Sequence, residues 1–294
     1  MSSLGTQLKQ TFSSGSVLTR LIYVNVAVFL IVNLIRIPFF LFDANDYAPA
    51  ITEWLAVPSN PLLLLYKPWT IITYMFLHEN FMHIFSNMLM LFFGGQLFME
   101  YLGEKRLLGL YILGGIAGAL LYIIVFNLFP VFSRTVHFSY ALGASAAVLA
   151  IFVAISTYIP HFIVNLFFVF RVKLMYVAMG LVVIDLISID KGNPGGHIAH
   201  LGGALFGFIF SKQLQKGNDF TLFFNKVIHS ISTLFTKKSK MKVVHSDKEN
   251  VNKKKNTNNK QQVVDAILDK ISRAGYESLS KEEKEILFNF SKEN

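Results

Sequence analysis

The chain has 294 residues, of which 53% are hydrophobic and only 15% are charged, and its mean hydropathy is +0.48. Average soluble domains carry about 25% charged residues, so this composition excludes soluble globular, disordered and fibrous classes and indicates a polytopic helical membrane protein. The lack of cysteine excludes a disulfide framework, thiolate metal sites and a cysteine nucleophile. The net charge of +9 lies mainly in residues 211–294, which carry +7, and therefore indicates a basic tail rather than a nucleic-acid surface.

Apolar runs in chain order predict an all-α membrane domain of six transmembrane helices over residues 20–215, after a polar N-terminal segment, 1–19. Residues 43–80, between the first two runs, contain tryptophan and proline and fit a long interfacial loop. Arg36, near the far end of the first run, is expected to reach the interface. The six runs cover residues 21–42, 81–102, 107–129, 139–159, 172–189 and 197–211.

The distribution of lysine and arginine predicts the orientation in the membrane. If both termini are cytoplasmic, the inner segments carry more basic residues than the outer ones, as the positive-inside rule requires. A bacterial inner membrane is the expected location, because no organelle transit sequence is recognisable. The inner residues are Lys9, Arg20, Lys105, Arg106, Arg171, Lys173, Lys212 and Lys216, and the outer ones are Arg36, Lys67, Arg134 and Lys191.

The C-terminal part is predicted to be a basic, disordered linker over residues 216–261 followed by a short helical hairpin over 262–294. Gly275 is expected to end the first helix of the hairpin, and Ser280 with Glu283 has the spacing of a capping box for the second. The hairpin has little core of its own. Its docking target stays open among the membrane domain, lipid and a cytoplasmic partner.

Polar residues within the apolar runs are candidates for function, because burying them in a membrane is costly. The predicted topology places them at a similar depth, within about 5–12 Å of the outer helix ends. Taken alone, a serine in a membrane helix is more often structural, and the nearby glycines have the spacing of close helix packing. The three clusters are His78, His83 and Asn87; Ser145 within residues 143–146; and His197 and His200 within residues 196–203.

A zinc site is not favoured by the histidine spacing. His78 and His83 are five residues apart, which places them about 140° apart on a helix, whereas the zinc-protease motif needs a spacing of four. His83 and Asn87 are four apart and share a face, so both can point at one atom. No metal and no cofactor are predicted.

These residues resemble the three signatures of rhomboid intramembrane serine proteases, in the right order. The signatures are His83-x-x-x-Asn87, Gly143-x-Ser145 and Ala199-His200-x-x-Gly203, supported by the segment 68–78 and by Glu100, Gly103 and Arg106. The resemblance covers about residues 15–215. It implies a six-helix rhomboid-like bundle whose substrates are transmembrane proteins in the lipid bilayer.

The resemblance also implies the role of each site residue. Ser145 would be the nucleophile and His200 its general base, while His83, Asn87 and the backbone N–H of Ser145 would stabilise the oxyanion. Rhomboids resemble a Ser–His dyad without a third acid, so for Asp185 a structural or interfacial role is preferred over an orienting one. The chain departs from the family in having Ala146 where many rhomboids have glycine and Leu149 where an aromatic commonly packs against the histidine.

The function expected is that of an intramembrane serine endopeptidase that cuts peptide bonds in or beside transmembrane segments. The loop over residues 190–196 is expected to cap the site. One alternative is a noncatalytic rhomboid-like protein that binds and escorts membrane clients, although this sequence keeps both the serine and the histidine. Another is a transporter or channel with a histidine proton relay, which leaves the Gly-x-Ser motif unexplained.

Overall fold

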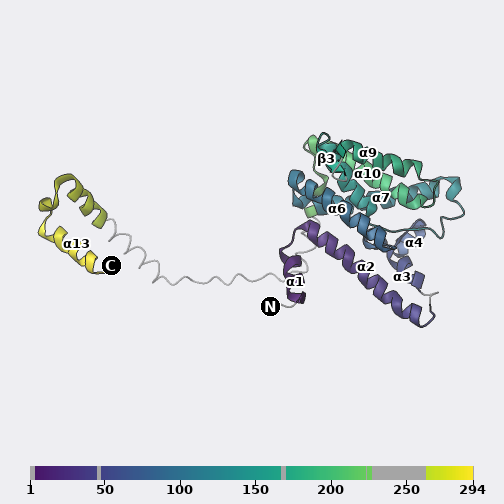
Figure 1. Cartoon of the computed structure of the whole chain (residues 1–294), viewed down its shortest axis with the longest axis horizontal. Coiled ribbons are helices and arrows are strands. Elements are labelled where there is room, and N and C mark those ends of the chain that lie inside the picture. The colour runs from purple at the N-terminus through teal and green to yellow at the C-terminus, as the bar shows by residue number, and fades with distance from the viewer. Residues whose placement is uncertain (1–3, 45–47, 167–169, 223, 227–262, 294) are drawn as a thin grey trace. The chain divides into compact units, whose positions relative to one another are not determined.

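The computed structural model describes residues 4–44, 48–166, 170–222, 224–226 and 263–293. The chain divides into two compact units, Met1–Phe235 and Thr236–Asn294. The first unit is a bundle of helices, in which α10 (Pro194–Gln215) packs against α7 (Glu104–Leu128) and against α9 (Leu174–Ile187) (Figure 1). Most of the linker predicted over residues 216–261 falls outside the described residues.

Three helices among the described residues are long and apolar enough to cross a membrane. They are α2 (Val17–Leu41), α6 (Phe81–Leu102) and α7 (Glu104–Leu128), and they coincide with the first three predicted spans. A short helix, α1 (Leu4–Ser14), precedes α2, and the Ser16 side chain caps α2 by accepting a hydrogen bond from the backbone N–H of Thr19. Only the first half of α2 packs closely, because its buried residues end with Val32.

The later helices differ in length from the apolar runs that predicted them. Helices α8 (Ser145–Tyr158) and α9 (Leu174–Ile187) have 14 residues each, or about 21 Å, which is shorter than the roughly 30 Å hydrocarbon core of a bilayer. Helix α10 (Pro194–Gln215) has 22 residues and begins three residues earlier than predicted. Pro194 favours the first helical position, and the Asn193 side chain accepts the N–H of Gly196. The predicted capping loop is correspondingly shorter, because residues 194–196 are helical.

The segment between α2 and α6, predicted as a loop, contains short helices. Trp69 and Trp54 stack with ring centroids 5.6 Å apart, and Trp69 donates to the carbonyl of Trp54, so the tryptophans hold this segment together. Arg36 donates to the hydroxyl of Thr52 in the same segment at 2.7 Å. The elements are α3 (Ala48–Leu55), β1 (Val57–Pro58), α4 (Pro61–Tyr66), α5 (Thr70–Thr73) and η2 (Tyr74–Phe76).

The start of α8 corrects the predicted span 139–159. The chain leaves η3 (Pro130–Phe132), forms β2 (Tyr140–Ala141) and pairs antiparallel with β1, with Val57 opposite Ala141. Gly143 has φ 128° and donates its N–H to the carbonyl of Tyr74 at 2.9 Å. This positive φ, which glycine adopts readily, is not helical, and α8 begins only at Ser145.

The all-α prediction holds except for this pair and one hairpin. Strands β3 (Ile163–Leu166) and β4 (Phe170–Lys173) connect α8 to α9 and pair antiparallel, with Ile163 opposite Lys173. Both sheets have two strands, among the residues described. They join helices rather than form the core.

Glycines allow α7, α8 and α10 to pack closely. A methyl group on Gly118 of α7 would lie 2.6 Å from the Cβ of Ala146 and 2.7 Å from the carbonyl oxygen of Ala199. On α10, methyl groups at Gly203 and Gly207 would overlap the α8 carbonyl oxygens of Ala146 and Ala150. The small residues of α7 and α10 therefore let both helices pack closely against α8.

A charged cluster holds the start of α7 to the segment after α10. Arg106 donates to Asp219 at 2.6 Å, and both the backbone N–H and the hydroxyl of Thr221 donate to the same carboxylate. Desolvation would raise the pKa of Asp219, but the hydrogen bonds from Thr221 and Arg106 outweigh it and hold that pKa below its usual range. The chain that follows α10 is therefore fixed beside the start of α7.

The second unit is a helical hairpin in its described part. It consists of a helix over residues 263–274, η4 (Tyr276–Ser278) and α13 (Lys281–Glu293), and Gly275 takes φ 80° where the first helix ends. The predicted capping box is confirmed, because Ser280 N–H donates to Glu283 at 2.8 Å and Glu283 N–H donates to Ser280 Oγ at 3.2 Å. Lys270 pairs with Glu283 across the hairpin at 2.8 Å.

Candidate active site

Ser145 and His200, separated by 55 positions in the chain, form a direct hydrogen bond. Ser145 is the first residue of α8, and His200 lies two turns into α10. The distance from Ser145 Oγ to His200 Nε2 is 2.6 Å. Gly118 on α7 packs against both Ala146 and Ala199, which are the neighbours of Ser145 and His200. This close packing holds the two helices that carry the pair in place. A serine hydroxyl bonded to an imidazole is the arrangement in which histidine can remove the hydroxyl proton.

Asp185 contacts His200 at the ring nitrogen that does not face Ser145. Its Oδ1 is 2.8 Å from Nδ1 of His200 and 2.8 Å from Nδ1 of His197, so one carboxylate oxygen joins both rings. Asp185 is 8% exposed, and the sequence favoured a structural or interfacial role for it. The sequence contained one indication of this contact. Asp185 is the one residue of α9 that is charged at neutral pH, and a charged residue within an apolar helix is costly unless it has a partner. Spacing along the chain could not reveal that α9 brings it to α10.

His83 points toward the serine from the first turn of α6. Its Nδ1 accepts the N–H of Glu79 at 3.5 Å, which leaves Nε2 as the donor of the neutral ring. A methyl group on Gly143 would lie 2.9 Å from this Nε2 and 3.4 Å from Ser145 Oγ, so both atoms face the same small space. Gly143 therefore has no room for a side chain. His78 is buried with its ring edge-to-face against His83, the centroids 5.1 Å apart.

Asn87 is buried one turn further along α6 and is oriented differently from His83. Its Nδ2 donates to the carbonyl oxygen of His83 at 2.8 Å. One amide hydrogen is thus engaged within the helix, and the other remains for a further acceptor. The structure consequently brings Asn87 beside His83 rather than into direct contact with Ser145.

The N-terminus of α8 adds backbone donors. The first N–H groups of a helix have no acceptor within it, and the helix dipole places partial positive charge at this end. Ser145 is the first residue, and Ala144 before it makes no side-chain cap. A negative oxygen beside Ser145 Oγ would therefore meet the N–H of Ser145 and Nε2–H of His83.

Among the described residues, a group of potential metal ligands is formed by Asp185, His197 and His200. Their ligand atoms lie within 4.8 Å of one another. However, the two Nδ1–Oδ1 hydrogen bonds already use the converging atoms, and His200 Nε2 is bonded to Ser145. Hydrogen bonding alone accounts for the arrangement of these three side chains.

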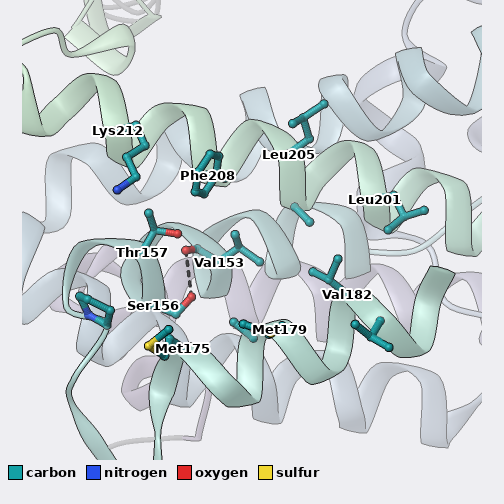
Figure 2. Close-up of a pocket in the computed structure, with 14 residues that line it drawn as sticks. Val153, Ser156, Thr157, Met175, Met179, Val182, Leu201, Leu205, Phe208 and Lys212 are labelled. Atoms are coloured by element: carbon teal, nitrogen blue, oxygen red, sulfur yellow. Dashed lines mark hydrogen bonds between the residues drawn. The ribbon is translucent and has the colours of Figure 1, made fainter.

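An apolar groove runs along α8, α9 and α10 near the site (Figure 2). Its volume is 490 Å³, and Leu201, which follows His200, lines it. Lys212 lines it further along α10 (Figure 2). The other lining residues are Val153, Ser156, Thr157, Pro160, Met175, Ala178, Met179, Val182, Val183, Ala204, Leu205 and Phe208.

Comparison with known proteins gives the same class of protein as the fold and the site. Residues 66–216 match the rhomboid domain, and residues 247–293 match a family of unknown function, DUF6576. RHOMBOID-like protein 12, mitochondrial, of Arabidopsis thaliana is 32% identical over 157 residues, covering 50% of this chain and 47% of that protein. Rhomboid protease AarA of Providencia stuartii is 28% identical over 182 residues, covering 58% and 60%.

The molecule is therefore a helical membrane protein with a serine and a histidine brought together from separate helices. It belongs to the rhomboid family, because the matched domain covers half of the chain. The chain spans about half to three-fifths of the length of these two relatives.

Proposed function

We propose that this chain is an intramembrane serine endopeptidase in which Ser145 is the nucleophile and His200 the general base. The observation that carries the proposal is the 2.6 Å hydrogen bond between Ser145 Oγ and His200 Nε2 within the rhomboid domain. The relative named as a rhomboid protease supports the same activity. The substrates are transmembrane proteins, cut in or beside a membrane-spanning segment.

The proposed reaction assigns each proton. His200 Nε2 takes the hydroxyl proton as Ser145 Oγ bonds to the scissile carbonyl carbon, and the carbonyl electron pair moves to oxygen. His83 Nε2–H, the N–H of Ser145 and the second amide hydrogen of Asn87 stabilise that oxyanion. When the C–N bond breaks, His200 returns the proton to the leaving amine, and water then hydrolyses the acyl-enzyme by the same route.

The proposal extends to topology. All six apolar runs, including the short α8 and α9, belong to a membrane domain over residues 20–215, with both termini cytoplasmic in a bacterial inner membrane. The basic excess at Arg20, Lys105, Arg106, Lys212 and Lys216 supports this orientation. Residues 236–294 are then cytoplasmic and available to a cytoplasmic partner.

The test uses the full chain reconstituted in liposomes with a transmembrane substrate. Ser145→Ala and His200→Ala are expected to abolish cleavage, and a fluorophosphonate probe is expected to label the wild type but not Ser145→Ala. Ser156→Ala, a buried serine on α8 that bonds the carbonyl of Val153, is the matched control and should keep both activities. Cleavage that persists in either site variant would refute the assignment, and folded protein without Ser145-dependent labelling would favour the escort function.

A further inference from the structure

Asp185 makes contacts that a serine–histidine pair alone does not need. We propose that Asp185 is a positioning residue that holds His200 in the reactive orientation and tautomer, so that Ser145, His200 and Asp185 work as a triad; this rests on the function proposed above. The three groups come from α8, α10 and α9. The order along the array is Ser145 Oγ, His200 Nε2, His200 Nδ1 and Asp185 Oδ1, with separations of 2.6 and 2.8 Å.

The hydrogen-bonding chemistry determines the tautomer. An ionised carboxylate only accepts hydrogen bonds, so a ring nitrogen 2.8 Å from Asp185 Oδ1 must carry the hydrogen. With its hydrogen on Nδ1, neutral His200 presents an unprotonated Nε2 to Ser145, which is the form a general base needs. After His200 takes the serine proton, the adjacent carboxylate stabilises the imidazolium, and Asp185 itself receives no proton.

Burial makes this contact stronger than a surface pair would be. The Asp185 side chain is 11% exposed and that of His200 25% exposed. A carboxylate removed from water is costly unless its lone pairs are used, and both histidine rings use the same oxygen. Leu149 stands where the family resemblance places an aromatic against the histidine, and it offers no hydrogen bond. The fixed orientation of His200 is therefore supplied from α9.

His197 shares Asp185 and gives the proposal a second, opposite test. Its Nδ1–H donates to the same Asp185 Oδ1 at 2.8 Å. This second hydrogen bond weakens the one that Asp185 accepts from His200. Among the described residues, His83 on α6 also faces the site and interacts with His200, and Glu79 lies beside His83. Both residues are common to all variants below. Removing Asp185 should make imidazolium formation at His200 harder, and removing the His197 donor should make it easier.

The experiment compares Asp185→Asn and His197→Phe with the wild type in liposomes, and measures kcat, KM and the pH dependence of kcat. Asp185→Asn is expected to lower kcat about 10²-fold or more with KM nearly unchanged, and to move the acidic limb of the profile to lower pH. His197→Phe is expected to keep kcat within several-fold and to move that limb to higher pH. If Asp185 had a purely structural role, the variants would change the yield of folded protein but would leave the acidic limb of the pH profile unmoved.

Each outcome decides the proposal. Wild-type kcat and pH profile in Asp185→Asn, while Ser145→Ala and His200→Ala are inactive, would overturn the triad and leave the proposed protease intact. Activity in all of these variants would instead refute the protease assignment. Loss of wild-type activity in EDTA, restored by zinc, would assign Asp185, His197 and His200 to a metal and also overturn the triad. If Asp185→Asn does not fold, the shift expected for His197→Phe tests the proposal alone, and an unmoved limb overturns it.

Discussion

At the scale of single residues, the two side chains of α6 that the sequence grouped as oxyanion donors differ in the structure. His83 Nε2 faces the space beside Ser145 Oγ, because both atoms crowd the same position next to Gly143. Asn87, in contrast, donates one amide hydrogen to the carbonyl oxygen of His83. The two residues share a helix face as their spacing predicted, but they are not equally placed toward the serine.

We therefore expect His83→Ala to lower kcat more than Asn87→Ala. Losing one preorganised donor costs about 10²–10³-fold in kcat, and Asn87 has a single amide hydrogen left to contribute. Single-turnover cleavage in liposomes measures the chemical step of both variants, with His161→Ala, an exposed residue beyond α8, as the control. An Asn87→Ala defect larger than that of His83→Ala would contradict the geometry at Gly143.

At the scale of elements, the geometry of Ser145 and His200 depends on how closely α7, α8 and α10 approach. Gly118 contacts Ala146 and Ala199 at once, so one methyl group added there pushes the two helices that carry Ser145 and His200. Overpacking of this kind costs about 1–3 kcal/mol of stability. A displacement of about 1 Å at the reacting atoms can cost 10²-fold in rate.

The corresponding prediction is that Gly118→Ala lowers both Tm and kcat. Gly180→Ala is the matched control, because a methyl group at Gly180 on α9 meets nothing within 4 Å and alanine favours the helix. Thermal unfolding in detergent and kcat in liposomes measure the two effects. If Gly118→Ala behaves like Gly180→Ala, the glycine contacts do not fix the pair.

The charged cluster after α10 predicts a pH-dependent stability. The pKa of Asp219 is held low by Thr221 and Arg106, so its contribution is present above the ordinary pKa of aspartate and is lost as pH falls through the depressed value. Asp219→Asn should lower Tm at neutral pH, and its difference from wild type should vanish in acid. Asp190→Asn, in the exposed loop before α10, is expected to have no effect at either pH. An Asp219→Asn deficit that persists unchanged at about pH 2–3 would contradict this account.

At the scale of the whole molecule, hydrophobic runs predicted the positions of α2, α6 and α7, and short motifs grouped Ser145, His200 and His83, which the structure brings close together. Residue spacing could not predict where α8 begins, because a strand pair and a glycine at φ 128° interrupt an apolar run that reads as helix throughout. It could not predict the contact of Asp185 with His200 either. That contact depends on the packing of α9 against α10, which adjacent sequence does not encode.

The orientation of the molecule is the last prediction. Arg106 and Asp219 join the start of α7 to the segment after α10, so Lys216 lies toward one end of α7 and Arg134, beyond its other end, lies at the opposite side. Because the chain has no cysteine, Lys216→Cys and Arg134→Cys each introduce a single thiol, and the parent is a label-free control. The basic excess at the Lys216 side predicts that an impermeant maleimide labels Arg134→Cys on intact bacterial spheroplasts, and Lys216→Cys only after lysis. The reverse pattern would place both termini outside and would refute the proposed topology, while labelling of both thiols on intact cells would show a mixed orientation.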